Sequence, residues 1–506
     1  MNNIIAALRQ HAAATPRKLA VDDGTQALDY GDVARHATAL AVVLKAAAPR
    51  VLGLLADNSA SWVLADLAAQ IAGIPLIPLP LFFSDAQLTH AVRAGGIDEV
   101  LTDQPERLAA ALGAAVGEAR HFHGTLKLVT LGTQAACLQD LPQGTDKVTF
   151  TSGTTGEPKG VCLGMAQMQA VALSLQQASA ARPDDRHLCL LPLATLLENI
   201  GGIYTPLLAG ATICVPPLAQ VGLSGSSGLD VLRMVQALGQ WRATSAIMVP
   251  QMLRALVAAC EAGAPVPIAL RYLSVGGAPV SDTLLQQASA LGLPVHEDYG
   301  LSEAGSVVAV NHYGANRPGS VGRLLPHTRV SFAPDGEILL HGARWLGYVG
   351  EPIAANDAPF ATGDTGFLDV DGYLHLTGRK KSIFITAFGR NVAPEWVERE
   401  LTAHSAVLQA VVFGEGRAFS CAVIFAHPHA APQLVDVALA QANSRLPDYA
   451  QVRGWVRAHQ PFSAQNGMLT PNGRPRRAAI LAAYRRQLHA LHEPTPKETN
   501  ELLPAA

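Results

Sequence analysis

The sequence predicts an α/β fold, with a large N-terminal domain of mixed and parallel sheets with helices and a smaller α+β C-terminal domain. Three observations predict it. At roughly 150 residues per domain, the 506 residues are enough for more than one domain. A composition that is 49% hydrophobic and 15% charged is typical of a protein with a large buried core. Short apolar runs alternate with stretches of helical spacing through the first two thirds of the chain, which favours α/β units.

Apolar runs of strand length recur along the N-terminal part. They are VLGLLA (51–56), EVLTD (99–103), KVTFTS (147–152), HLCLLPL (187–193), TICVP (212–216), SAIMVP (245–250) and YLSVGG (272–277). Between several of them lie Ala/Leu-rich stretches with helical spacing, such as 59–73 and 230–241. Strands separated by helices pair in parallel. Because ligands of such sheets bind beyond the carboxyl ends of the strands, we expect the functional site at that edge.

The pattern changes from about residue 318 onward. Short strands linked by turns are expected at 336–342 and within 366–379, where Asp371-Gly372 predicts a hairpin turn. A helix over 393–403 begins with an early proline and acidic residues, and strands are expected at 407–414 and 420–426. We therefore predict two domains, 1–378 and 379–506.

Charge and cysteine content exclude several classes of protein. The formal charge is -3 and the chain has no basic stripe interleaved with aromatic residues, so we expect no nucleic-acid partner. The cysteines, at 137, 162, 189, 214, 260 and 421, form no C-x-x-C motif, and we expect buried thiols in a reducing compartment. The N-terminus does not read as a signal peptide, and no apolar run approaches the ~20 residues of a membrane span. A cytoplasmic protein without a membrane span is expected.

One short segment, TFTSGTTGEPKG (149–160), has the composition of an anion-binding loop. It directly follows the predicted strand 147–152, and a glycine-rich turn at that position exposes successive backbone N–H groups. Hydroxyl groups of Ser152, Thr154 and Thr155 add donors, and Lys159 adds a positive charge. Taken alone, the segment also fits an ordinary polar hairpin.

Three later segments favour the anion-binding interpretation. The first is HEDYGLSEAG (296–305), which combines an aromatic residue, a glycine, a hydroxyl and a carboxylate. The second is TGDTGFLDVDGYLHLTGRKK (362–381), which places Asp364 and Arg379 on either side of a hairpin. The third is LTPNGRPRRA (469–478). In this order and at these separations, the four segments resemble the AMP-forming acyl and aryl ligases, which include acyl-CoA synthetases, nonribosomal adenylation domains and luciferases. The resemblance covers nearly the whole chain, and the S-G-T-T-G-x-P-K-G motif is highly specific to that family.

The resemblance implies a two-step reaction. A carboxylic acid attacks the α-phosphate of ATP, which releases pyrophosphate and forms an acyl-adenylate, and the acyl group then passes to a pantetheine thiol. The implied cofactors are ATP, Mg²⁺ and coenzyme A, or the phosphopantetheine arm of an acyl carrier protein as the alternative acceptor. A fatty acid is the expected substrate, because two segments resemble the long-chain branch. The resemblance also implies a C-terminal domain that rotates between the two steps.

The same resemblance implies a role for each matching residue. Tyr299 would stack on adenine, and Asp364 would accept both ribose hydroxyls. Glu303 would bind magnesium, Ser302 would contact phosphate where the family usually has threonine, and Arg379 would donate to the ribose or a phosphate. The remaining implied ATP contacts are Thr151, Ser152, Gly153, Thr154, Thr155, Gly156 and Lys159 at the phosphates, and Gly277, Ala278, Asp298 and Gly300 at the base.

Two further segments carry implied roles outside the ATP site. Within 378–398, Lys381 occupies the hinge position and Gly389 the loop that approaches the thiol. LPLATLLENIGG (191–202) resembles the acyl-pocket motif of long-chain acyl-CoA synthetases, in which Glu198 fits the pattern. Thr195 stands where that motif usually has histidine or an aromatic residue, so the acyl tunnel is more open or packs differently.

One position departs from the family. Its final motif usually carries a lysine that reaches the reacting carboxylate and the α-phosphate, and the matching residue here is Arg474. Arginine keeps the charge but is a larger planar group. Adenylation is therefore slow, uses Arg474 differently, or has been abandoned; we expect an active enzyme because the other implied ATP contacts are intact.

Rival interpretations remain at this point. GLSEAG (300–305) approaches the nucleophile motif of serine hydrolases, with Ser302 central and His312 or His375 as a base. An arginine at position 474, in place of the family's lysine, is also consistent with a non-catalytic binder of ATP or acyl-adenylate. A carrier protein could replace CoA as the acceptor of the acyl group. The sequence leaves open the acyl chain length, aryl versus alkyl acids, the acceptor and the oligomeric state.

Overall fold

The computed structural model describes residues 3–113, 116–132, 141–152, 158–225, 228–342, 345–351, 358–388, 390–470 and 473–492. The chain falls into two compact units, Met1–Thr377 (the large unit) and Gly378–Ala506 (the small unit). No helix among the described residues is long and apolar enough to cross a lipid bilayer.

A nine-stranded sheet (sheet A) organises one half of the large unit. The strands from β16 to β1 are parallel, and those beyond them at both edges are antiparallel. In spatial order the sheet contains β18 (Arg323–Leu324), β17 (Ser306–Val310), β16 (Val295–Leu301), β15 (Tyr272–Val275), β14 (Ser245–Met248), β10 (Arg186–Leu188), β11 (Thr212–Cys214), β1 (Leu19–Asp22) and β2 (Ala27–Asp29).

An eight-stranded sheet (sheet B) organises the other half. Its central strands, from β8 to β5, are parallel, and both flanks are antiparallel. In spatial order it contains β21 (Gly347–Tyr348), β9 (Pro158–Leu163), β8 (Lys147–Ser152), β4 (Leu76–Pro78), β3 (Leu52–Leu55), β5 (Glu99–Thr102), β7 (Leu126–Leu131) and β6 (Val116–His123).

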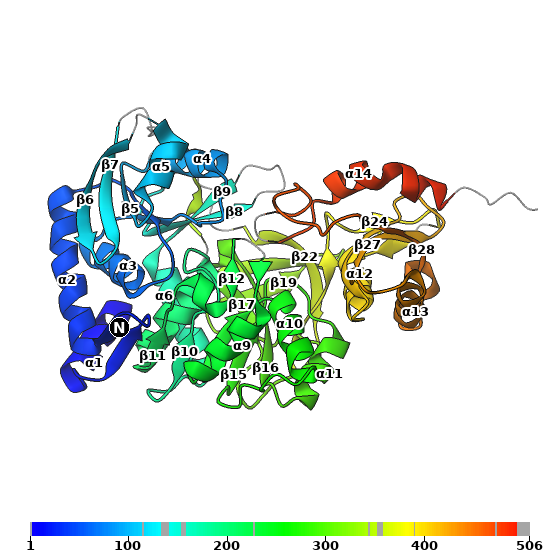
Figure 1. Ribbon diagram of the computed structural model, residues 1–506, viewed down its shortest axis with the longest axis horizontal. Helices are drawn as coiled ribbons and strands as arrows, with labels where there is room; N and C mark the ends of the chain where they lie inside the picture. The colour runs from blue at the N-terminus through cyan, green and yellow to red at the C-terminus, as the bar shows by residue number, and fades with distance from the viewer. Residues whose placement is uncertain are drawn as a thin grey trace, which may run out of the picture. The chain divides into compact units, whose positions relative to one another are not determined.

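Helices pack on both faces of both sheets, which gives five layers. Helices α9 (Val231–Gln240), α10 (Pro250–Glu261) and α11 (Asp282–Ala290) share one core with the outer face of sheet A (Figure 1). A second core joins both sheets through the helices between them, α2 (Tyr30–Ala47), α3 (Ala60–Ala72), α6 (Met165–Ala178) and α8 (Thr205–Ala209), with α1 (Ile4–Ala14) beside them. On the far face of sheet B lie α4 (Asp85–Gly95) and α5 (Pro105–Leu112).

Local sequence signals set the ends of these helices. For α3, the Ser59 side chain accepts a hydrogen bond from the N–H of Trp62, and the helix ends at Gly73, whose φ of +71° suits glycine. The predicted helices 59–73 and 230–241 are confirmed within a residue or two.

Most strand pairs in the rest of the large unit and in the small unit are antiparallel. A separate sheet in the order β19 (Thr328–Phe332), β20 (Glu337–Gly342), β22 (Phe360–Leu368) and β23 (Leu374–Arg379) contains the predicted hairpin. In the small unit, β26 (Val407–Phe413), β27 (Ser420–Ala426) and β28 (Val452–Arg457) form a sheet, beside the short pair β24 (Phe384–Ile385) and β25 (Asn391–Val392). Helices α12 (Pro394–Thr402) and α13 (Pro432–Asn443) share one core with this sheet, and α14 (Arg477–Ala490) shares another.

The predicted fold class is confirmed: a large mixed α/β unit precedes a small α+β unit. Several strands end earlier than predicted, and the largest difference is at 187–193, where β10 ends at Leu188. Beyond it the N–H of Leu191 bonds the carboxylate of Glu198, at 3.2 Å, and Pro192 has no N–H to donate to a sheet. The chain therefore leaves sheet A to form a buried loop.

Candidate functional site

The glycine-rich segment lies between two paired strands. Strands β8 and β9 are antiparallel neighbours, with Ser152 opposite Pro158 and Thr151 opposite Lys159. The Thr151 hydroxyl also lies 3.4 Å from the Lys159 carbonyl oxygen. Gly153, Thr154, Thr155 and Gly156, which were predicted to hold phosphates, lie outside the described residues. Thr151 and Lys159 therefore sit at the two strand ends that hold the segment.

Lys159 and Glu303 both contact one tyrosine, Tyr348. The Lys159 ammonium ion-pairs with Glu351 at 2.9 Å and lies 4.8 Å from the centre of the Tyr348 ring. The Tyr348 hydroxyl donates to the Glu303 carboxylate at 2.7 Å. Burial, followed by the charge of Glu303, raises the pKa of Tyr348, so the phenol stays protonated and remains a donor. The structure thus brings together two predicted site residues that are far apart in the sequence.

The backbone around Glu303 is also held. Ser302 and Glu303 lie in a short 3-10 helix, Ser302–Ala304, which directly follows β16. The Glu303 carbonyl oxygen accepts from the N–H of Trp345 at 3.2 Å and from the Gln167 side chain at 3.3 Å. These contacts fix the main chain of Glu303 and leave its carboxylate partly exposed.

The residues predicted to contact the base lie within β16 and in the turn that follows β15. Asp298 is 6% exposed, and its Oδ2 accepts from the Ser274 hydroxyl at 2.7 Å. Burial raises the pKa of Asp298 to about 6, and the Ser274 hydrogen bond opposes this shift only in part. A Cβ atom on Gly276 would lie 2.0 Å from Oδ1 of Asp298, so only glycine fits there. Gly277 follows with a φ of +83°, which suits glycine, and Gly277 and Ala278 are exposed in this turn.

Tyr299 and Asp364, predicted to bind adenine and ribose, are in direct contact. The Tyr299 hydroxyl donates to Oδ2 of Asp364 at 2.9 Å. Both residues are nearly buried, at 6% and 8% exposed, and the Tyr299 ring packs in an apolar cluster with residues such as Ile338. At Gly300 the chain approaches β17 so closely that a Cβ would lie 2.0 Å from the Ser306 carbonyl oxygen. Hence β16 and β22, 65 residues apart at this contact, meet at one point.

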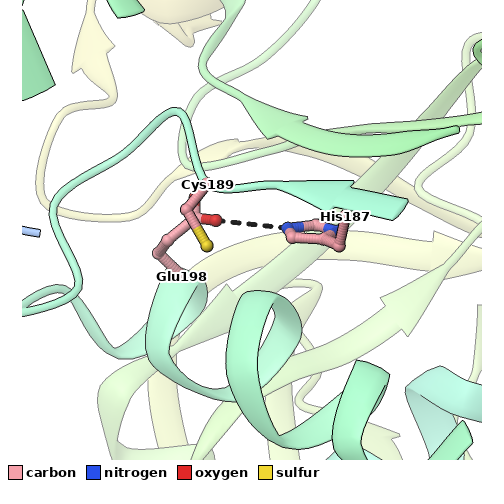
Figure 2. Close-up of side chains that lie close together, drawn as sticks. All are labelled: His187, Cys189 and Glu198. Atoms are coloured by element: carbon pink, nitrogen blue, oxygen red, sulfur yellow. Dashed lines mark hydrogen bonds and ion pairs between the residues drawn. The ribbon is translucent and has the colours of Figure 1, made fainter. Parts of the chain in front are cut away.

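The predicted acyl-pocket segment lies deep in the large unit. The Thr195 hydroxyl donates to the Pro192 carbonyl at 2.7 Å, which caps the turn before α7 (Leu196–Glu198). Glu198 is fully buried and lies 3.2 Å from Nε2 of His187, and Cys189 lies beside them (Figure 2). The sequence indicated Glu198 but missed His187 and Cys189.

A pocket next to this segment lies between sheet A and the helices of the central layer. Its apolar lining includes Leu175, Leu197, Ile247 and Val307. Asp185, His187, Ser245, Arg271 and Ser274 add polar groups. Ser274, which lines this pocket, also donates a hydrogen bond to Asp298.

The remaining predicted residues belong to the small unit. Arg379 ends β23, and Lys381 is exposed two residues later. Gly389 lies outside the described residues. Arg474 is exposed in the loop before α14, and its N–H donates to the Thr470 hydroxyl at 3.1 Å. Arg477, which the sequence did not single out, anchors the start of that helix by bonding Glu398 at 2.8 Å.

The part of the chain that the structure describes contains no hydrogen-bonded pair of Ser302 with His312 or His375, which a serine hydrolase would need. His375 lies 3.1 Å from the carboxylate of Asp369, and its ring stacks on Phe367. Neither His375 nor His312 hydrogen-bonds Ser302 within the described residues.

Comparison with known proteins defines the class. Residues 8–343 match the family described as AMP-binding enzyme, and residues 381–495 match the AMP-binding enzyme C-terminal domain. The first match spans more than half of the chain, so the chain belongs to the AMP-binding family of adenylate-forming enzymes, and it is an enzyme of the AMP-forming acid–CoA ligase type. The family predicted from the sequence motifs is confirmed.

Curated relatives differ in their acids. The chain is 30% identical over 432 residues to a feruloyl-CoA synthase from Amycolatopsis sp, covering 80% of this chain and 84% of the relative. It is 27% identical over 435 residues to the long-chain-fatty-acid–CoA ligase FadD15 of Mycobacterium tuberculosis, covering 69% of this chain and 70% of the relative. At these identities, the family is shared and the particular acid is left open.

Solved structures share the fold. An anthranilate CoA ligase, AuaEII, in complex with anthranoyl-AMP superposes with a TM-score of 0.79 at 19% identity, over 95% of this chain and 97% of that one. The o-succinylbenzoate CoA synthetase of Bacillus subtilis in complex with ATP and a magnesium ion gives a TM-score of 0.72 at 23% identity, over 91% and 97%.

Proposed function

We propose that this enzyme uses ATP to activate a carboxylic acid, a fatty acid in the first place, as an acyl-adenylate, and then transfers the acyl group to the thiol of coenzyme A. The observation that carries the proposal is the hydrogen bond between Tyr299 and Asp364. It joins the end of a parallel strand in sheet A to a carboxylate on a separate sheet, at the edge where α/β folds bind nucleotides.

The geometry supports a distinct task for each group. The Asp364 carboxylate would accept from a ribose hydroxyl in addition to the Tyr299 hydroxyl, since a carboxylate has about four lone-pair sites. Lys159 would neutralise charge on the leaving pyrophosphate; its ion pair with Glu351 is half exposed and worth ~1 kcal/mol or less, so phosphate can replace it at small cost. Ser302 would donate to phosphate from the start of the 3-10 helix.

The donor chemistry fits magnesium at Glu303. This ion favours one or two carboxylates combined with substrate phosphates, and Glu303 presents a partly exposed carboxylate beside Tyr348. When bound, the ion would shield the phosphate charges. The chain's own contribution is the fixed main chain of Glu303, which Trp345 and Gln167 hold.

The pocket beside the predicted acyl-pocket segment (191–202) supports a hydrophobic acid as the substrate. Leu175, Leu197, Ile247 and Val307 would contact an alkyl chain. Relatedness to the FadD15 ligase supports the same choice. An aryl acid is the second candidate, because the feruloyl-CoA synthase is the more identical of the two relatives named above.

Adenylation exchange with labelled pyrophosphate tests the first step directly. The purified chain is assayed with octanoic, palmitic, oleic, benzoic and ferulic acids, and the acid that supports exchange is then assayed for thioester formation with CoA and with a holo acyl carrier protein. We expect exchange with a fatty acid and transfer to CoA. Exchange with ferulate alone would make the enzyme an aryl ligase, and transfer to the carrier protein alone would change the acceptor.

Variants connect the assay to the site. Asp364→Asn removes a charged acceptor, so kcat/KM for ATP should fall about 10- to 100-fold, at ~1.5–3 kcal/mol for a hydrogen bond to a charged group. Asp335→Asn, an exposed aspartate in the turn between β19 and β20, is the matched control and should leave kcat/KM for ATP unchanged. If no acid supports exchange while Arg474→Lys restores it, the native chain is impaired in adenylation. If neither protein exchanges yet ATP still binds, the proposal is wrong and the chain is a nucleotide binder.

A further inference from the structure

We propose that His187, Cys189 and Glu198 form a binding site for one divalent transition-metal ion, in the first place zinc, buried in the large unit (Figure 2). Each residue offers one donor atom: a ring nitrogen, the thiol sulfur and a carboxylate oxygen. These atoms all lie within 4.8 Å of one another. The site is separate from Glu303 and goes beyond acid activation.

The donor spacing fits a tetrahedral ion. Nitrogen and oxygen ligands each lie about 2.0–2.1 Å from zinc, which places two of them about 3.3 Å apart at a tetrahedral angle. Nε2 of His187 and Oε1 of Glu198 are 3.2 Å apart. Sulfur binds zinc at about 2.3 Å, so a tetrahedral ion would hold Sγ about 3.6 Å from the nitrogen and oxygen ligands. Sγ of Cys189 lies within 4.8 Å of both. A mixed nitrogen, sulfur and oxygen set favours zinc and its neighbours over magnesium or calcium.

Hydrogen bonds to Ser245 and to the backbone of Leu191 orient two of the three ligands. Nδ1 of His187 lies 3.0 Å from the hydroxyl of Ser245, which directs Nε2 toward the other donors. Oε2 of Glu198 accepts from the N–H of Leu191 at 3.2 Å, which leaves Oε1 facing His187. Metal-binding histidines almost always have such a partner on the second ring nitrogen.

The backbone leaves room where the donor atoms converge. A Cβ atom on Gly202 would lie 2.5 Å from Oε1 of Glu198, 3.1 Å from Sγ of Cys189 and 3.1 Å from Nε2 of His187. Glycine therefore keeps open a point that all three donors face. Gly202 belongs to a π-helix, Asn199–Tyr204, that directly follows Glu198, and this rare form occurs frequently at functional sites.

Charge balance supports a dication. Glu198 is 0% exposed, and within the described part of the chain its one ion-pair partner is His187. A zinc ion bound by one carboxylate, one thiolate and a neutral imidazole has no net charge, and binding releases the thiol proton to solvent. Of the three ligands, His187 also lines the adjacent pocket, together with Gly201 and Ser245.

Metal content and cobalt spectroscopy test the site without any activity assay, so the outcome does not depend on the proposed function. The full chain is expressed with added zinc, freed of any tag and desalted, and its metal is measured by mass spectrometry. We expect one zinc per chain. Replacement of zinc by cobalt should give a thiolate-to-cobalt charge-transfer band and the visible bands of a tetrahedral ion.

Variants assign the ligands. Cys189→Ser should abolish the charge-transfer band and reduce zinc content at least tenfold, and Gly202→Ala should do the same by filling the site. Cys162→Ser, a fully buried thiol of sheet B, is the matched control and should retain zinc and the band. A chelator should lower the melting temperature of the wild type and leave that of Cys189→Ser unchanged.

The wild type alone can overturn the proposal, even if a variant fails to fold. A wild-type chain that carries far less than one metal ion, and that gives no thiolate band when cobalt is added, would show that these residues form a metal-free hydrogen-bonded cluster. Zinc retained in full by a folded Cys189→Ser variant would equally refute the assignment.

Discussion

Asp298 is a buried carboxyl group whose ionisation should reduce the stability of the folded protein. Its pKa of about 6 lies about two pH units above the ordinary value of 3.8, because the group is 6% exposed. At about 1.4 kcal/mol per unit, the folded state disfavours the carboxylate by about 3 kcal/mol relative to the unfolded state. Ser274 donates the hydrogen bond that keeps the penalty from being larger.

The sign of the pH dependence follows from proton binding. Below about pH 4, Asp298 is protonated in both states and costs nothing. Between about pH 4 and pH 6 the folded state holds the proton more tightly, so stability falls as pH rises, and above pH 6 the full penalty remains. Asp298→Asn removes the ionisation and keeps an acceptor for Ser274. The variant should match the wild type near pH 4 and exceed it by up to about 3 kcal/mol at pH 7.5.

Urea unfolding, followed by circular dichroism from pH 4.5 to pH 7.5, measures this difference between the two proteins. Ser274→Ala provides a test in the opposite direction, because losing the hydroxyl should raise the pKa of Asp298 further and extend the loss of stability to higher pH. A constant difference between Asp298→Asn and the wild type at every pH would refute the reasoning, as would a less stable Asn variant at pH 7.5.

Three further outcomes are expected. Tyr299→Phe removes the donor to Asp364 and should raise the KM for ATP about fivefold, at ~1 kcal/mol for one hydrogen bond; normal ATP kinetics in this variant would mean that the hydroxyl does not position Asp364. Arg474→Ala should slow pyrophosphate exchange about 10²- to 10³-fold without weakening ATP binding in a calorimeter, and an unchanged rate would remove Arg474 from the reaction. Lys147→Met should lower the free energy of unfolding in urea by ~3–5 kcal/mol, because it leaves Asp66, 2.6 Å from the buried ammonium, without its cation. Adding Asp66→Asn should recover most of the loss. A Lys147→Met variant as stable as the wild type would show that the ion pair is not needed.

The buried cation at Lys147 also marks a limit of sequence patterns. Residues 147–152 were predicted as a strand, and β8 has these bounds, yet Lys147 is 1% exposed and bonds both Asp66 and Tyr204. Burial lowers the pKa of Lys147, and the charge of Asp66 opposes that shift. Periodicity identifies the strand but does not reveal which distant residues will surround its first side chain.

The sequence by itself determined the fold class, several strands and helices of both units, and the family. Apolar period, caps and turn residues act over a few positions, and the order of four motifs survives at low overall identity. Tertiary structure alone decided which side chains meet: Tyr348 between Lys159 and Glu303, and His187 with Cys189 beside Glu198. Such contacts join residues from different strands and helices, so they depend on how the layers pack, and no local pattern records that packing.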